Sequence, residues 1–281
     1  MIELLLGDLP PRKFLEQVYT RVPHSRPGGA AGFTSFGGWP AVEEILRAPD
    51  VDAFLAREGQ MWEGGRRPSF AQAREHFAQG HTLVIRSAEK HDPELARLAS
   101  GFREDLAAPV NVHVYCTPAE RSGFRWHYDP EDVFIVQTHG TKEYQLRKNT
   151  VNPWPLLEQM PKDLKYEREV QPFWTCVLRE GDWLYIPTGW WHSARGVEGE
   201  SITLAIGLMT PAAIELLEVL KKELLSSVVW RQRLPTLGKA AGASPEELLK
   251  TYQSLFTDLG RDLSRLLADE SFARRYLEER R

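Results

Sequence analysis

Three residues carry side chains that bind metal ions, and their spacing could bring them together. His127 and Asp129 stand two residues apart, and His192 ends a Pro-x-Gly-Trp-Trp-His run further along the chain. Side chains on a β-strand alternate between faces, so residues i and i+2 point the same way. On a strand, the imidazole of His127 and the carboxylate of Asp129 would converge on one point, where a second strand could supply His192.

Two histidines and one carboxylate form the facial triad of non-haem Fe(II) oxygenases, which leaves coordination positions open for a cosubstrate and O₂. An isolated His-x-Asp is more often a surface hydrogen-bonding pair. Its combination with the downstream Pro-x-Gly-Trp-Trp-His run in a β-rich context favours a metal site. We expect surface or loop positions for the other histidines apart from His113, namely His24, His76, His81, His91 and His139.

Lys142 is a candidate for binding an anion. On an expected strand the side chains of Lys142, Tyr144 and Leu146 share one face, and Glu143 and Gln145 share the other. If the first face points inward, the ammonium is buried and requires an anionic partner. No acidic residue on that strand shares its face. An exposed lysine at a strand start is the alternative, but together with the metal ligands the pattern favours an anionic ligand such as a dicarboxylate.

A cleanly alternating segment, residues 110–117, supplies a polar face to the same region. Asn111, His113, Tyr115 and Thr117 share that face, while the even-numbered positions are apolar or Cys. We expect His113 to line the cavity. A hydrogen-bonded cavity histidine is favoured over a fourth metal ligand.

Residues from about 81 to 208 show a period of two, which indicates β-structure. Turn signals, including His139-Gly140 and residues 198–200, separate the runs. Many short strands with flanking helices predict a mainly β fold, a double-stranded β-helix or jelly roll. The long Pro-containing connection over 149–172 is predicted to be functional, for example as a lid. The expected strands are 82–86, 110–117, 133–138, 142–148, 173–179, 183–187, 192–197 and 201–208.

Helical periodicity flanks this β-region on both sides. Residues 1–80 are predicted to be mostly helical, with Ser69 as an N-cap. Beyond Pro211 an apolar stripe at helical spacing predicts further helices. We therefore expect one domain over 1–210 and a helical region over 211–281. The expected helices begin after Pro11, cover 41–46, 51–57 and 69–79, and continue over about 214–225, 244–259 and 262 to the end.

Composition limits the classes of protein that this chain can belong to. With 281 residues, of which 42% are hydrophobic, and ~150 residues per domain, about two domains with a real core are expected. A formal net charge of −4 provides no basic field for direct nucleic-acid binding. No apolar run or basic N-terminal segment predicts a membrane span or signal peptide. Cys116 and Cys176 cannot build a disulfide framework, so we expect a reduced, cytoplasmic protein.

Longer stretches of the sequence resemble the JmjC/cupin family of Fe(II)- and 2-oxoglutarate-dependent oxygenases. Within that family they are most similar to the ribosomal oxygenases, which are protein hydroxylases with a cupin-like JmjC domain. The similarity covers roughly residues 10–210 and is carried by segments 14–19, 80–86, 111–118, 123–129, 132–142, 181–192 and 201–207.

This resemblance implies a role for each metal-site candidate. His127, Asp129 and His192 would bind Fe(II), and Lys142 stands where the family's basic residue pairs with the distal carboxylate of 2-oxoglutarate. The implied reaction uses 2-oxoglutarate and O₂ to hydroxylate a protein or peptide side chain, with release of succinate and CO₂.

The resemblance also implies cosubstrate contacts. Tyr115 matches a tyrosine that helps to bind 2-oxoglutarate, and we assign its neighbours Thr117 and His113 to the same pocket. Two positions depart from the pattern. His113 stands where ribosomal oxygenases often carry Asn, and Ala205 stands near a position that is often Ser or Thr.

The implied partners are a protein or peptide substrate, possibly a ribosomal protein, and a second copy of the chain. The resemblance places dimerisation in the helical region over 211–281, whereas the family's winged-helix domain would be reduced or missing. Two other functions stay open: hydroxylation of a small molecule or natural product, and metal binding without catalysis. Histone demethylation is disfavoured, because nothing in the chain resembles a chromatin-reading or zinc module.

Overall fold

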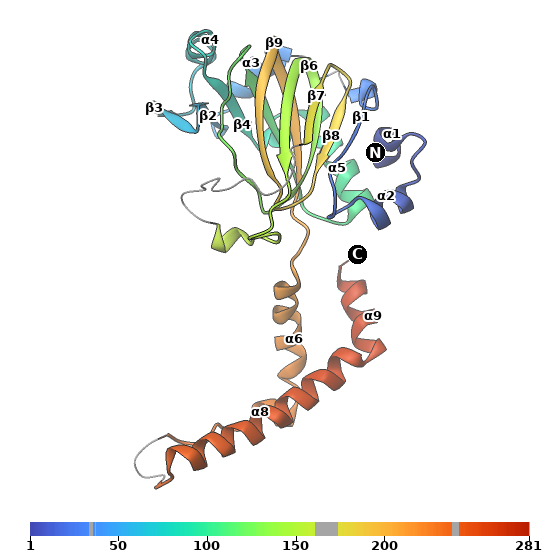
Figure 1. Ribbon diagram of the computed structural model, residues 1–281, viewed down its shortest axis with the longest axis vertical. Helices are drawn as coiled ribbons and strands as arrows, with labels where there is room; N and C mark the ends of the chain where they lie inside the picture. The colour runs from blue at the N-terminus through green and yellow to red at the C-terminus, as the bar shows by residue number, and fades with distance from the viewer. Residues whose placement is uncertain (34–35, 37, 161–173, 238–241, 281) are drawn as a thin grey trace. The chain divides into compact units, whose positions relative to one another are not determined.

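The computed structural model describes residues 1–33, 36, 38–160, 174–237 and 242–280 (Figure 1). Contacts divide the chain into two compact units, Met1–Thr210 and Pro211–Arg281, which are described separately below. The predicted functional connection over 149–172 lies partly outside the described residues.

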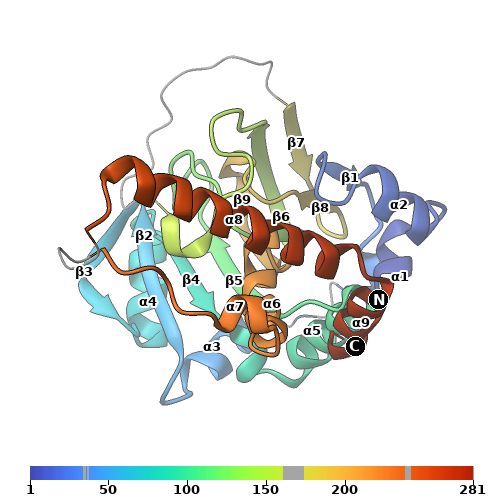
Figure 2. The same ribbon diagram turned by 90° about the horizontal axis from the view of Figure 1, so that it is seen from below.

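An antiparallel sheet forms the first unit. Within the described residues the strand order is β1-β8-β6-β9-β5-β4-β2-β3, and β7 pairs with β6. The sheet with its flanking helices confirms the predicted mainly β jelly roll (Figures 1 and 2). The strands are β1 (His24–Arg26), β2 (Asp52–Arg57), β3 (Gln60–Arg66), β4 (Thr82–Arg86), β5 (Val110–Thr117), β6 (Asp132–Arg147), β7 (Trp174–Leu178), β8 (Trp183–Ile186) and β9 (Trp191–Leu208). The helices of this unit are α1 (Ile2–Leu6), α2 (Pro11–Gln17), α3 (Gly38–Leu46), α4 (Phe70–Ala78) and α5 (Pro93–Leu106).

Two apolar clusters pack on opposite faces of the central strands. Phe134 of β6 packs against Phe102 of α5, with ring centroids 5.1 Å apart, and against Phe14 of α2 at 5.9 Å. Its neighbour Ile135 belongs to a second cluster with Leu184 of β8. Since successive residues of β6 serve different clusters, this strand is buried on both faces and its register is strongly specified.

Strand β6 is continuous where the sequence pattern predicted two strands and a turn. The predicted turn at His139-Gly140 is a bulged part of β6, where the pairing with β9 shifts register. Val133 before the bulge and Lys142 after it both line the same pocket, although an unbroken alternation would place them on opposite faces. The break predicted over 198–200 likewise lies inside β9.

The amide of Gln137 supports this bulge. It is fully buried, and its Nε2 donates to the carbonyl of His139 at 2.6 Å and to Oγ of Ser201 at 3.0 Å. Its Oε1 accepts from the hydroxyl of Thr203 at 3.0 Å. These bonds pair polar groups that the irregular ladder would otherwise leave unpaired.

The helix predicted over 51–57 is wrong, because this segment is strand β2. Ladder hydrogen bonds to β3 and β4 on its two sides outweigh local preference. Helix α5, which buries Leu95, Leu98 and Phe102, was not predicted from the sequence either. Helix α4 begins as predicted, since the hydroxyl of Ser69 accepts the N–H of Gln72 at 3.2 Å in a capping box.

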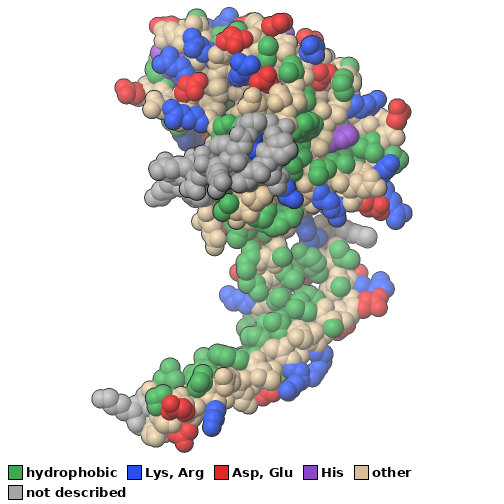
Figure 3. Space-filling view, in the orientation of Figure 1, with side chains coloured by type: hydrophobic (Ala, Val, Ile, Leu, Met, Phe, Trp, Pro, Cys, Tyr) green, Lys and Arg blue, Asp and Glu red, His purple; other side chains and the backbone are tan. Residues whose placement is uncertain are grey.

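The second unit is helical, as predicted. Helix α8 runs unbroken where an interruption was expected between 259 and 262, and Asp269 caps the helix that follows. Apolar side chains collect on the surface of this unit, and Leu217, Leu249 and Phe256 are each more than half exposed (Figure 3). No helix of the described residues is long and apolar enough to cross a membrane. The helices are α6 (Leu216–Leu224), α7 (Val228–Arg231), α8 (Pro245–Ala268) and α9 (Glu270–Glu279).

Replacing Gly140 should destabilise the sheet far more than replacing Gly199. Both have positive φ, +70° and +61°, but a Cβ on Gly140 would lie 2.1 Å from the carbonyl oxygen of Glu200, whereas one on Gly199 meets nothing within 4 Å. We expect Gly140→Ala to lower the free energy of unfolding by about 3 kcal/mol or more. Gly199→Ala should cost about 1 kcal/mol. Urea unfolding measures both, and equal losses would contradict the assigned role of the bulge.

Candidate metal centre

The backbones of His127 and His192 are paired directly. The N–H of His127 donates to the carbonyl of His192 at 3.0 Å, and the N–H of His192 donates to the carbonyl of His127 at 2.7 Å. Residues that face each other in an antiparallel pair place their side chains on the same face. The two imidazole centroids are accordingly 4.2 Å apart.

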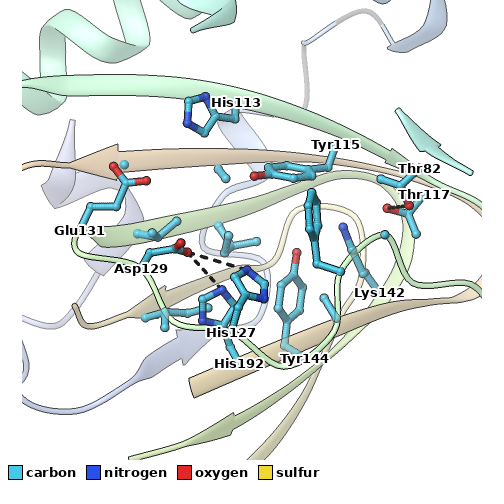
Figure 4. Close-up of a pocket in the computed structure, with 18 residues that line it drawn as sticks. Thr82, His113, Tyr115, Thr117, His127, Asp129, Glu131, Lys142, Tyr144 and His192 are labelled. Atoms are coloured by element: carbon cyan, nitrogen blue, oxygen red, sulfur yellow. Dashed lines mark hydrogen bonds and ion pairs between the residues drawn. The ribbon is translucent and has the colours of Figure 1, made fainter. Parts of the chain in front are cut away.

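Asp129 reaches these rings without the strand that the sequence pattern predicted. His127 forms only an isolated bridge, and residues 128–130 are irregular. The carbonyl of Asp129 instead accepts the N–H of Gly189 at 2.9 Å, which ties it to the turn before His192. Its Oδ2 lies 3.4 Å from Nε2 of His192 and 3.9 Å from Nε2 of His127 (Figure 4).

A buried carboxylate, that of Asp132, binds the backbone of the same turn. Asp132, only 1% exposed, accepts the hydroxyl of Tyr185 and the N–H of Thr188, the latter at 3.2 Å. The hydroxyl of Tyr185 in turn accepts the N–H of Thr20 at 2.7 Å. Burial raises the pKa of Asp132 to about 6. Two hydrogen bonds thus fix the turn before His192, one from Gly189 to Asp129 and one from Thr188 to Asp132.

Both histidines point Nε2 toward Asp129. Nδ1 of His127 lies 2.8 Å from the carbonyl of Arg125, and Nδ1 of His192 lies 3.0 Å from that of Trp190. A carbonyl can only accept, so we assign the proton to Nδ1 and the lone pair to Nε2 in each neutral ring. The three residues offer ligand atoms within 4.8 Å of one another. This donor set fits a divalent transition metal with open coordination positions.

The protonation states also suit a metal site. Burial and the neighbouring His192 lower the pKa of His127 to about 4. Burial raises the pKa of Asp129, but its interactions with the protonated forms of His192 and His127 outweigh burial and hold this pKa well below its usual range. The same pairing with Asp129 raises the pKa of His192, so a bound metal ion would take the place of the proton on its Nε2. Asp129 is therefore ionised and His127 neutral at pH 7, the states in which these groups bind metals.

Lys142 lies in the same pocket, and its side chain is 4% exposed. Its Nζ lies 5.4 Å from the ring centroid of Tyr115 and 5.7 Å from that of Tyr144. In the part of the chain that the structure describes, no carboxylate forms an ion pair with it. Burial lowers its pKa to about 8. The pocket therefore contains a buried cation whose charge a bound anion would balance.

The remaining predicted residues also line this pocket. Thr117 is buried, and its hydroxyl lies 3.4 Å from that of Thr82 near the Lys142 end (Figure 4). His113 accepts the N–H of Ser87 at Nδ1, at 3.0 Å, and lies outside the metal-binding group. Burial, with the charge of Arg86, lowers the pKa of His113 to about 4.

Glu131 lines the pocket beyond Asp129 and was not predicted from the sequence. Nδ2 of Asn111 donates to its Oε2 at 3.2 Å. Burial and the charge of Asp129 raise the pKa of Glu131 to about 7. One feature of the sequence could have identified Glu131: it is a second acidic residue two positions after the proposed metal ligand Asp129.

Comparisons with known proteins show relatives of this domain. Residues 87–216 match the JmjC domain family. The chain is 31% identical over 132 residues to the bifunctional lysine-specific demethylase and histidyl-hydroxylase NO66 of Dictyostelium discoideum, covering 47% of this chain and 25% of that protein. It is 31% identical over 145 residues to ribosomal oxygenase 2 of Mus musculus, covering 51% and 30%. The chain thus spans under a third of the length of these curated relatives.

A solved structure shows the same fold over most of the chain. YcfD, a ribosomal oxygenase from Escherichia coli, has been solved in complex with cobalt and 2-oxoglutarate. It aligns with a TM-score of 0.61 over 90% of this chain and 67% of that chain, at 20% identity. At this identity the likeness shows a shared fold. The domain match and the sequence relatives show that residues 87–216 are similar to the JmjC domain of the ribosomal oxygenases.

Proposed function

We propose that this chain is an Fe(II)- and 2-oxoglutarate-dependent oxygenase that hydroxylates a side chain of a protein or peptide. One observation carries the proposal: a His127, Asp129 and His192 cluster shares a pocket with a buried lysine that lacks an ion pair among the described residues. The names of two relatives, a histidyl-hydroxylase and a ribosomal oxygenase, support a protein substrate.

The three clustered residues would hold the metal through two imidazole Nε2 atoms and one carboxylate oxygen. Bound Fe(II), together with 2-oxoglutarate and O₂, supplies the chemistry that forms succinate and CO₂ and replaces C–H by C–OH. The chain's own task is to orient the ligands. Nδ1–H bonds to the carbonyls of Arg125 and Trp190 fix the two rings.

Lys142 would pair with the far carboxylate of 2-oxoglutarate. The hydroxyls of Thr82 and Thr117 lie near the ammonium as further polar partners, and the rings of Tyr115 and Tyr144 flank it. The aromatic walls exclude water, so the charge pair acts in a low dielectric. His113 would line the pocket without binding the metal ion, because its Nδ1 already accepts a backbone hydrogen bond.

Incubation with Fe(II), 2-oxoglutarate and cognate ribosomal extract tests the substrate class. We expect a single-oxygen mass gain on one protein, dependent on 2-oxoglutarate, with succinate formed in equal amount. Succinate formed only with small molecules would instead favour a small-molecule hydroxylase. Loss of a methyl group from a methylated lysine of a protein would instead favour a lysine demethylase, the other activity named for the relative NO66. No succinate under any condition would leave the non-catalytic metal-binding alternative.

Affinity for 2-oxoglutarate should fall above pH 8. The lysine binds the carboxylate when protonated, and its pKa in the free pocket is about 8. Binding at higher pH must take up a proton, so the Kd at pH 9 should exceed that at pH 7 by about tenfold. Calorimetry on the Co(II)-loaded protein measures this change.

Lys142→Met supplies the control for that titration, because every other titrating group remains. It should bind 2-oxoglutarate weakly at both pH values and show no tenfold change. The assignment of Lys142 fails if wild type and variant share one pH profile.

We also propose that residues 211–281 form a dimerisation region and that the protein works in a reduced, cytoplasmic setting. Exposed apolar side chains on α6 and α8, such as Leu217 and Phe256, support the first point. Both cysteines are free, in agreement with the second. Direct nucleic-acid binding is not expected from the net charge of −4. Light scattering should show a dimer at micromolar concentration. A monomer at that concentration would contradict the proposed dimerisation.

A further inference from the structure

A series of buried hydrogen bonds connects the turn before His192 to the N-terminal segment of the chain. Oδ1 of Asp132 accepts the N–H of Thr188 in this turn, at 3.2 Å, and also the hydroxyl of Tyr185 on β8. The oxygen of that hydroxyl accepts the N–H of Thr20, at 2.7 Å. Thr20 follows α2 and precedes Tyr185 by 165 positions. Segments at opposite ends of the domain sequence are therefore joined through one carboxylate and one phenol.

The carboxylate at the centre of this series is a buried charge. The side chain of Asp132 is only 1% exposed, and its two donors are a neutral hydroxyl and a backbone N–H. Among the described lysines and arginines, none forms an ion pair with it. A carboxylate buried in this way costs free energy that an apolar side chain of similar size would not. Stability alone does not account for it, whereas holding two donors in one fixed geometry does.

The hydroxyl of Tyr185 is held in place by its surroundings. The side chain is fully buried, and its ring packs edge-on against Phe14 of α2 and is stacked with Tyr19, at centroid distances of 5.3 and 5.9 Å. A hydroxyl that accepts a hydrogen bond donates a stronger one, so the N–H of Thr20 strengthens the bond from Tyr185 to Asp132.

The backbone of Thr20 is strained where it joins this series. Its φ is +60°, a conformation that β-branched residues rarely adopt. Strain of this kind persists only where the surrounding structure holds the residue in place. In this conformation the N–H of Thr20 donates to the hydroxyl of Tyr185. The contacts around this hydrogen bond therefore outweigh the local preference of threonine.

The turn that Asp132 binds affects two of the proposed metal ligands. Thr188 precedes the ligand His192, and the residue after Thr188, Gly189, donates its N–H to the carbonyl of Asp129 at 2.9 Å. A movement of this turn would therefore change the position of His192 relative to Asp129.

We propose that Asp132 and Tyr185 are positioning residues that hold the metal ligand His192 in place, with the backbone N–H of Thr20 as their support. This inference rests on the proposed hydroxylase function, because it concerns the same metal site. Groups that orient the ligands of a metal ion set its affinity and coordination geometry without touching it. The series of hydrogen bonds orients the turn in this way before any metal ion binds.

Titration with Co(II), followed by visible absorption, tests the proposal. Tyr185→Phe removes one oxygen atom, which contacts no proposed metal ligand. We expect this variant to raise the Kd for Co(II) about threefold or more, the value of one hydrogen bond, and to change the absorption spectrum of the bound ion. Asp132→Ala removes the acceptor of both hydrogen bonds and should raise the Kd by about tenfold or more.

Two control variants separate positioning from a general loss of stability. Tyr19→Phe also removes a tyrosine hydroxyl from this aromatic group, but that hydroxyl lies 2.7 Å from the hydroxyl of Thr210, outside the series. Leu98→Ala removes a buried side chain of α5 and lowers the stability of the core. Both variants should keep the Kd and the spectrum of wild type. A loss of Co(II) affinity in Leu98→Ala as large as that in Tyr185→Phe would overturn the proposal.

Amide hydrogen exchange, measured by NMR on the metal-free protein, provides a readout that requires no metal ion. The N–H of Thr188 should exchange about threefold or more faster in Tyr185→Phe than in wild type, and at the wild-type rate in Tyr19→Phe. Equal exchange in wild type and Tyr185→Phe overturns the proposal. These comparisons stand even if Asp132→Ala fails to fold.

The two measurements also separate this inference from the proposed function. A wild type that binds no Co(II) removes the hydroxylase proposal, and exchange at Thr188 then decides whether the turn depends on Tyr185. A wild type that binds Co(II), with the same Kd and spectrum in Tyr185→Phe and Asp132→Ala, removes only the positioning role.

Discussion

Two backbone hydrogen bonds between His127 and His192 hold the site together. They join an irregular segment to the start of β9, and residues that face each other in such a pair share a face regardless of the loops around them. Asp129 depends on the same turn through the N–H of Gly189, and Asp132 fixes that turn at Thr188. Without this pairing the three ligands would lie on segments with no common geometry.

Charge is arranged along the pocket in a consistent order. A buried cation, Lys142, occupies one end, the carboxylate of Asp129 lies among the histidines, and Glu131 occupies the other end (Figure 4). In a low-dielectric pocket each unpaired charge is costly, so each favours an occupant of opposite charge. The order predicts where two occupants lie: a dicarboxylate at Lys142 and a metal ion at the ligand cluster. The pocket therefore constrains the positions of both the cosubstrate and the metal ion.

Features that depend on neighbouring residues in the chain were predicted from the sequence. Features that depend on contacts between distant residues were not. The alternation of residues 110–117 predicted β5 and its pocket face, and Ser69 predicted the start of α4, because both depend on neighbours in the chain. The helix expected at 51–57 failed because β2 gains its hydrogen bonds from two distant strands. The inward position of Lys142 depends on the bulge at Gly140, which no period-two pattern reveals. The hydrogen bond between Asn111 and Glu131 joins residues 20 positions apart, which no local pattern predicts.

The most direct test of the metal centre is a titration with Co(II) followed by visible absorption. Wild type should bind one ion, and added 2-oxoglutarate should change the spectrum by entering the coordination sphere. Asp129→Ala should weaken Co(II) binding by about 100-fold or more, since it removes a ligand outright. His139→Gln, at an exposed position, should bind as wild type does. Equal Co(II) affinity in wild type and Asp129→Ala would contradict the assignment of His127, Asp129 and His192 as the metal ligands.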